Sequence, residues 1–101
     1  MIIRIVKLTL VPSKVEQFLE IFDTVREPIR SFPGCLYTEM LTDVSKSGIV
    51  FTYSHWNTEA DLENYRNSEL FQSTWARVKP LFAAKAEAWS LDRQVDNPTD
   101  K

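Results

Sequence analysis

The sequence predicts one α+β domain whose elements follow the order strand, helix, strand, strand, helix, strand. β-Branched residues dominate residues 2–11, which is typical of a strand. Apolar residues with helical spacing follow from 15 to 32. Two alternating segments, 35–44 and 49–56, then flank a short polar connection, as in a β-hairpin. The length of 101 residues suits a single domain.

The first half of the chain carries several boundary signals. Pro12 ends the first strand because proline lacks the amide hydrogen that strand pairing uses. Ser13 and Glu16 have the spacing of a capping box and predict a helix start. Pro28 predicts a kink or an end of this helix just before it, because proline clashes with the preceding turn. One face of the helix collects apolar side chains, at Val15, Phe18, Leu19, Phe22, Val25, Ile29 and Phe32.

The second half predicts a hairpin, a broken helix and a last strand. A Pro33-Gly34 turn leads into the hairpin. Thr58 opens a second capping box, and this helix is expected to end near Arg66. A further helical piece then bends or stops at Pro80, and a strand over residues 86–93 completes the pattern.

This order of elements is the split βαβ of ferredoxin-like folds, with an antiparallel sheet. We expect the domain to cover residues 1–93 and a polar tail to cover residues 94–101. Apolar side chains fall on both faces of the predicted sheet, with Tyr53 on one face and Trp56 on the other. Helices cover only one face of such a sheet, so we expect a second copy of the chain to cover the other in a homodimer.

Composition disfavours several classes of partner and cofactor. A formal charge of −2 without a basic cluster argues against a nucleic-acid partner. Cys35 is the only cysteine, and no apolar run reaches the ~20 residues of a membrane span, so we expect a cytoplasmic protein without a membrane partner. With only Gly34 and Gly48, a phosphate-binding loop for a nucleotide or flavin is disfavoured. A single histidine makes a zinc site improbable, so no metal and no cofactor are expected.

Two charged or ionisable residues are candidates for chemistry. His55 is the only histidine and therefore the only side chain with a reference pKa near neutrality. It is either a base that takes a proton from a phenol or quinol, or a strand-end residue packed beside Trp56 or at a dimer interface. Arg4 lies in an otherwise apolar strand, where it either anchors an anionic substrate or reaches solvent at the edge of the sheet.

Four aromatic residues are candidates for a binding pocket. Tyr65, Trp75, Tyr53 and Tyr37 could hold a flat substrate, with the phenolic hydroxyls fixing its orientation. Trp75 shares a helix face with apolar neighbours, so a place in the core is the alternative for it. Tyr65 lies near the break between the two helical pieces, where irregular backbone often borders a cleft.

Several boundary motifs follow one another in a defined order: Pro12, Phe18, the Pro33-Gly34-Cys35-Leu36 turn, Trp56, Thr58 to Asp61, and Ser68 to Phe71. Their order and spacing resemble those of the antibiotic biosynthesis monooxygenase domain family, of the dimeric α+β barrel class. The resemblance covers about residues 2–93 and implies homodimers whose sheets close into a barrel, with a pocket between sheet and helices. Members of that family include cofactor-free oxygenases of quinols and aromatic polyketides, haem-degrading enzymes and proteins without an assigned activity.

The resemblance argues against the haem-degrading branch. That branch has an asparagine, a tryptophan and an axial histidine at positions that correspond here to Val6, Tyr65 and Trp75. An indole cannot be an axial ligand of iron. We therefore expect a cofactor-independent monooxygenase of a small quinol or polyphenolic ring, with His55 as base and Tyr65 and Tyr53 orienting the ring. The alternative is a non-catalytic small-molecule-binding or dimerisation module of the same fold.

Overall fold

The computed structural model describes residues 1–94 and has the α+β order that the sequence predicts. Two short 3₁₀ helices, Pro12–Lys14 and Lys79–Leu81, border the first and last helices. All of the predicted tail beyond residue 94 lies outside the described residues. The main elements are β1 (Ile2–Thr9), α1 (Val15–Arg30), β2 (Cys35–Thr42), β3 (Ile49–Trp56), α2 (Glu59–Arg66), α3 (Glu69–Val78) and β4 (Glu87–Leu91).

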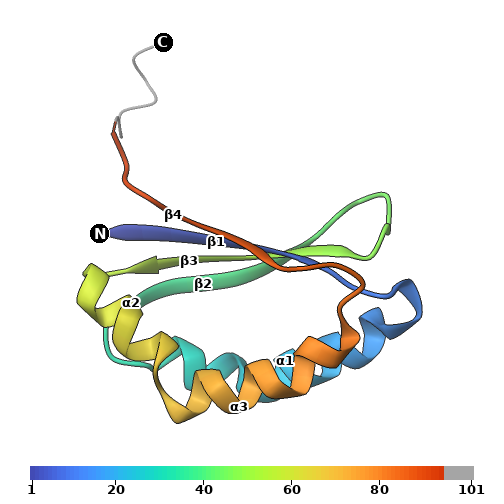
Figure 1. Cartoon of the computed structure of the whole chain (residues 1–101). Coiled ribbons are helices and arrows are strands. Elements are labelled where there is room, and N and C mark those ends of the chain that lie inside the picture. The colour runs from blue at the N-terminus through green and yellow to red at the C-terminus, as the bar shows by residue number, and fades with distance from the viewer. Residues whose placement is uncertain (95–101) are drawn as a thin grey trace.

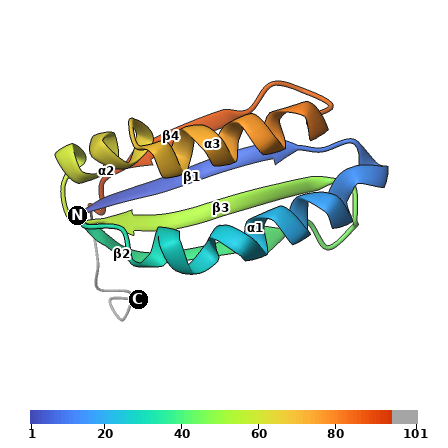
Figure 2. The same ribbon diagram turned by 90° about the horizontal axis from the view of Figure 1, so that it is seen from below.

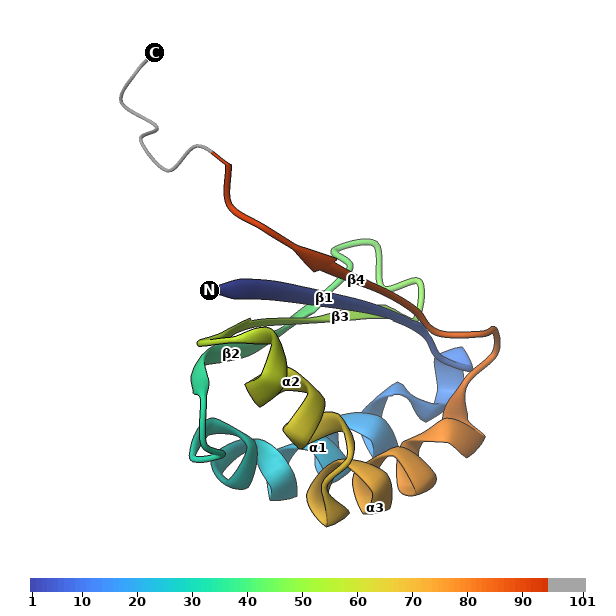
Figure 3. The same cartoon turned by 60° about the vertical axis from the view of Figure 1, so that its left-hand side comes forward.

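The four strands form one antiparallel sheet with the order β2-β3-β1-β4. All three α-helices lie on the same side of this sheet (Figures 1 and 2). A view from the side shows α2 and α3 beside α1, beneath the strands (Figure 3). The sheet therefore has an inner face, toward the helices, and an outer face that no element of residues 1–94 covers. No helix within residues 1–94 is long and apolar enough to cross a membrane.

The core lies between the inner face and the helices. The amphipathic pattern of α1 explains this, because its apolar face is the one that the sheet and α3 bury. The strands contribute alternate residues, as the pleat requires. The core consists of Leu8, Leu10, Phe18, Phe22, Val25, Ile29, Val50, Val78 and Leu81.

The predicted cap at the start of α1 is wrong, and so is an end of this helix before Pro28. The Ser13 side chain does not cap α1, which instead begins at Val15 after the 3₁₀ turn. The helix also continues through Pro28 to Arg30. Proline at this point lies in the last turn, so only one helical hydrogen bond is lost, while Ile29 is still buried in the core. Tertiary packing thus outweighs the local signal.

The start of α2 and the break before α3 are confirmed. The Thr58 hydroxyl accepts a hydrogen bond of 3.0 Å from the Asp61 amide, which is the N-cap half of the predicted capping box. The Ser68 hydroxyl accepts a 3.1 Å bond from the Phe71 amide and so begins α3 directly after the break. These two caps fix where the chain turns between α2 and α3, on the inner side of the sheet.

Replacing Gly34 with alanine is expected to destabilise the protein by about 1–3 kcal/mol. Gly34 has φ of 90°, a left-handed conformation, and a Cβ placed there would collide with the Asp61 side chain. Its carbonyl also accepts a 2.8 Å hydrogen bond from the Asn57 amide, so the turn cannot move away freely. Urea denaturation checks this, with Cys35→Ala as the neighbouring control. A Gly34→Ala protein as stable as the parent would contradict the prediction that a side chain at this position strains the turn.

Candidate functional site

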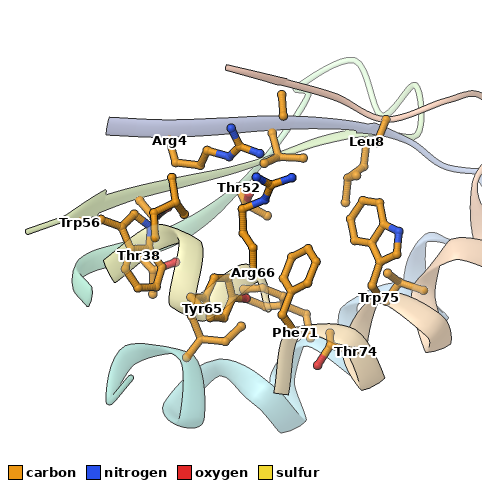
Figure 4. Close-up of a pocket in the computed structure, with 18 of the residues that line it drawn as sticks. Arg4, Leu8, Thr38, Thr52, Trp56, Tyr65, Arg66, Phe71, Thr74 and Trp75 are labelled. Carbon is orange, nitrogen blue, oxygen red and sulfur yellow. Dashed lines mark hydrogen bonds between the residues drawn. The ribbon is translucent and has the colours of Figure 1, made fainter. Parts of the chain in front are cut away.

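A cavity of about 350 Å³ lies between the inner face of the sheet and the helices. Its volume is near the lower end of the usual range for small-molecule sites. Figure 4 shows side chains from the strands above and from α2 and α3 below pointing into this space. Its residues include Arg4, Val6 and Leu8 of β1, Thr38 of β2, Thr52, Ser54 and Trp56 of β3, Tyr65 and Arg66 of α2, Phe71, Thr74, Trp75 and Val78 of α3, and Ala86 and Ala88.

Aromatic rings form one continuous wall of the cavity. Tyr65 stacks on Trp56 with ring centroids 4.9 Å apart and meets Phe71 edge to face at 5.2 Å. Phe71 in turn stacks on Trp75 at 5.6 Å. Each ring is held by its neighbours, so the wall is a preformed surface for a flat ligand. The short α2 and α3 helices position it, because their caps place Tyr65 and Phe71 on either side of the helix break.

Tyr65 is a neutral hydrogen-bond donor in this wall. Burial raises the pKa of its phenol well above the ordinary value, because the apolar surroundings disfavour the phenolate. The hydroxyl therefore keeps its proton at neutral pH and cannot serve as a base there. It can donate to an oxygen atom of a bound molecule, which is the orienting role that the sequence suggests for it.

The stability of the protein is expected to fall above pH 10 because of Tyr65. The buried phenol has a higher pKa in the folded than in the unfolded chain, where it is about 10. Its contribution is therefore fully present below pH 10 and is lost as the pH rises above 10, at up to about 1.4 kcal/mol per pH unit. Urea denaturation at pH 9 and pH 11 measures this. Tyr65→Phe should lose less stability between the two pH values; an equal loss would contradict the assignment.

A row of polar side chains crosses the sheet beside the Trp56 end of the aromatic wall. Pairing between strands places Thr38, Ser54, Arg4 and Ser90 side by side on the inner face. Thr38 and Ser54 are buried, and Arg4 Nη1 donates a 2.9 Å hydrogen bond to Ser90 Oγ. Burial, and secondarily the charge of Arg66, lower the pKa of Arg4. The cavity is thus polar and positive at one end and apolar at the other.

The structure brings three predicted site residues together and separates two others from them. Arg4, Tyr65 and Trp75 all line the cavity. Tyr53 and His55 do not, because they alternate with Ser54 and Trp56 along β3 and so lie on the outer face.

On the outer face the two residues have partners of their own. A 2.8 Å hydrogen bond joins His55 Nε2 to the Tyr53 hydroxyl. The Tyr37 ring lies 5.5 Å from the imidazole, and its hydroxyl donates a 2.8 Å bond to Glu39. Tyr37 therefore belongs to this outer group and not to the cavity. The expectation that His55 acts on a ring beside Tyr65 is not supported by this geometry.

Sequence reasoning missed three groups of the site. The sequence pattern marks Arg66 only as the end of a helix, although it follows Tyr65 directly and reaches into the same cavity (Figure 4). Neither Thr38 nor Ser54 is singled out by the local sequence pattern. Polar residues on a buried face are informative, because each buried polar group needs a hydrogen-bond partner. Only strand register shows that they lie in one row with Arg4.

The ionisable residues of the cavity restrict its chemistry. Within residues 1–94, those that line it are Arg4, Arg66 and Tyr65, all favouring negatively charged or oxygen-rich ligands. Histidine, cysteine and acidic residues in the described part of the chain form no group of three that could hold a metal ion. Val6 and Trp75 also line the cavity, and neither side chain can ligate haem iron. The site suits a small planar molecule with at least one oxygen substituent.

Comparison with known proteins agrees with this architecture. A crystal structure of an antibiotic biosynthesis monooxygenase superposes with a TM-score of 0.88 at 18% identity, covering 94% of this chain and 100% of the other. A conserved protein from Methanosarcina mazei Go1 gives a TM-score of 0.86 at 19% identity, over 93% of this chain and 94% of that one. A protein from Pseudomonas aeruginosa gives 0.82 at 22% identity, over 93% and 94% of the two chains. These likenesses show the fold.

Sequence comparison gives the family. An uncharacterized protein from Synechocystis sp. is 28% identical over 76 residues, which are 75% of this chain. The match spans only 52% of that relative, so the chain corresponds to about half its length. The family model for antibiotic biosynthesis monooxygenases matches residues 1–77, from the first strand to the end of the aromatic wall. The chain therefore belongs to the antibiotic biosynthesis monooxygenase family.

Proposed function

We propose that the protein is a cofactor-independent monooxygenase that oxidises a small quinol or other phenolic ring bound in the cavity. The observation that carries the proposal is the aromatic wall facing a half-buried arginine, in a chain of this family. One oxygen atom of O₂ becomes a carbonyl oxygen on the ring. The other leaves as water with the two hydrogens that the substrate loses, and the substrate supplies the electrons.

The chain's own residues bind and orient the ring. Tyr65 and Trp75 contact its faces or edges, and the neutral Tyr65 hydroxyl donates to one of its oxygens. Arg4 favours the ionised form of the ring oxygen beside it, because a nearby positive charge lowers the pKa of a phenol. The ionised ring is the electron-rich species that reacts with O₂. The surrounding apolar residues exclude water from it.

We also propose that the protein is a homodimer. In one protomer, the outer face exposes large apolar and aromatic side chains, including Tyr37 and Trp89. A single protomer of this size rarely leaves such a surface in water. A second copy that packs its own outer face against this one would bury His55 and Tyr53 as well. This assigns the outer residues to assembly and the inner residues to the ligand.

A binding module is the second candidate function. It is favoured by one observation, which is that no residue of the described cavity lining has an ordinary pKa near neutrality. Such a module would use the same aromatic wall and the same arginine. It would hold its ligand without consuming oxygen, so turnover separates the two proposals.

Oxygen uptake by the purified, metal-free protein tests the proposed function. The substrates are hydroquinones and polyphenols, each compared with its own autoxidation. We expect saturable uptake that Tyr65→Ala abolishes and that Leu19→Ala, on an exposed part of α1, leaves intact. His55→Ala is expected to keep its turnover, whereas loss of a general base would lower the rate ~10²–10⁴-fold. Uptake equal to autoxidation across the panel would leave the binding module.

A further inference from the structure

The polar end of the cavity holds two arginines that face each other. The Arg4 and Arg66 side chains enter from opposite sides, one from β1 and one from the end of α2, and their guanidinium groups converge (Figure 4). The two guanidinium groups are close enough that the charge of Arg66 lowers the pKa of Arg4. Two like charges held together beside apolar side chains repel each other, and the arrangement is more favourable when an anion lies between them.

The chain itself supplies little negative charge to this pair. No carboxylate within residues 1–94 forms an ion pair with Arg4, whose Nη1 donates a hydrogen bond to the neutral Ser90. The charge of Glu63 also acts on Arg4 and partly opposes the lowering of its pKa. Arg66 has Glu63 at 3.5 Å, but that contact is a long one between neighbours on an exposed helix surface. Within residues 1–94, the one carboxylate that acts on this pair is therefore set against two positive charges, and one of these charges is left without a partner. A ligand can neutralise it.

The positions of the two arginines suggest two different tasks. Arg4 is half-buried in the polar row of the sheet, beside Ser54. Arg66 is more exposed, with 45% of its side chain accessible, and ends α2 at the border of the cavity. An arginine fork matches the two oxygens of a carboxylate, whereas the ring oxygen that becomes ionised offers a single atom. The more exposed Arg66 guanidinium thus suits a carboxylate that extends from the ring toward solvent.

We propose that the substrate is a hydroxylated aromatic carboxylic acid, whose carboxylate is bound by Arg66 while its ring oxygen faces Arg4. This inference rests on the proposed function for the ring and on the arginine pair for the acid. The cavity of about 350 Å³ has room for one or two fused rings with such substituents. Two positive charges then meet two negative ones, the carboxylate present from the start and the ring oxygen ionised for the reaction.

Binding without turnover tests the inference. Three probes share one ring: 2,5-dihydroxybenzoate, its methyl ester, and hydroquinone. Their affinities are measured anaerobically by calorimetry or by the fluorescence of Trp56 and Trp75, both of which line the cavity. We expect the acid to bind roughly tenfold or more tightly than the ester or hydroquinone. Arg66→Gln should remove this preference and leave ester binding unchanged. Arg77→Gln, on the exposed surface of α3, should keep the preference.

The outcomes distinguish the inference from the proposed function. Equal binding of acid and ester, failure of the acid to bind at millimolar concentration, or a preference that survives in Arg66→Gln would overturn the inference. Acid preference that depends on Arg66, together with oxygen uptake equal to autoxidation, would refute the oxygenase while supporting carboxylate recognition. Uptake with hydroquinone and not with the acid would support the oxygenase and overturn the inference.

Discussion

Replacing Trp56 with alanine is expected to lower the free energy of unfolding by about 3–5 kcal/mol and to abolish ring binding. Trp56 is only 1% exposed, which makes it the largest fully buried side chain. Its indole stacks on Tyr65 and contacts Phe32 edge to face, and its Nε1 donates a 3.0 Å hydrogen bond to Ser54 Oγ. Truncation would leave a void behind Tyr65 and the buried Ser54 hydroxyl without this donor.

Urea denaturation and calorimetric titration measure the two effects separately. Trp56→Phe is the matched control, because it keeps an aromatic ring against Tyr65 and loses only the hydrogen bond and part of the volume. It should lose clearly less stability than the alanine variant. If Trp56→Ala lowered the free energy of unfolding by less than ~1 kcal/mol, the indole ring would not be the side chain on which the aromatic wall packs.

The order of the elements could be predicted because each one carries its own local pattern. The helical spacing that includes Phe18, Phe22 and Ile29 is visible without any neighbour, and the structure buries all three. The errors at Ser13 and Pro28 also have a local cause. Both residues were judged by propensity alone, whereas the packing of Val15 and Ile29 against the sheet decides where α1 begins and ends.

The site could be predicted only in part. Alternation along a strand divides its side chains between two faces of the sheet, but it does not show which face lies toward the helices. In β3 the set with Tyr53 is as apolar as the set with Trp56. Either could have faced the helices. The helices cover the second set, so His55 falls on the opposite side of the sheet from Tyr65. A residue type suited to catalysis is therefore no guide to its position.

Arg66 shows a second limit of prediction from sequence, which concerns contacts between distant parts of the chain. In the sequence it is a charged residue at the end of a short polar helix, as many exposed arginines are. Its approach to Arg4, more than sixty positions earlier, depends on how α2 packs against the sheet, which no local pattern reports. Tyr65 could be predicted because it lies near a helix break, where irregular backbone often borders a cleft. Its neighbour had no such signal.

Replacing Trp89 with glutamate is expected to convert the proposed homodimer into monomers. Trp89 lies in one row with Ile5 and Tyr53 on the outer face and is 43% exposed in the protomer. A carboxylate there can stay in water in the monomer, so the fold should survive. In the dimer it would be buried without a partner, at a cost of several kcal/mol.

Light scattering at micromolar concentration measures the mass of each variant. Trp89→Phe keeps an apolar ring in the row and is expected to remain a dimer, while circular dichroism verifies that both variants are folded. A parent protein with the mass of a monomer would refute the dimer. A dimeric Trp89→Glu protein would mean that the copies meet through another surface, and the exposed Tyr37 and His55 would then need a different explanation. Loss of the dimer with the fold intact would assign the outer face to assembly and leave the inner cavity as the place for chemistry.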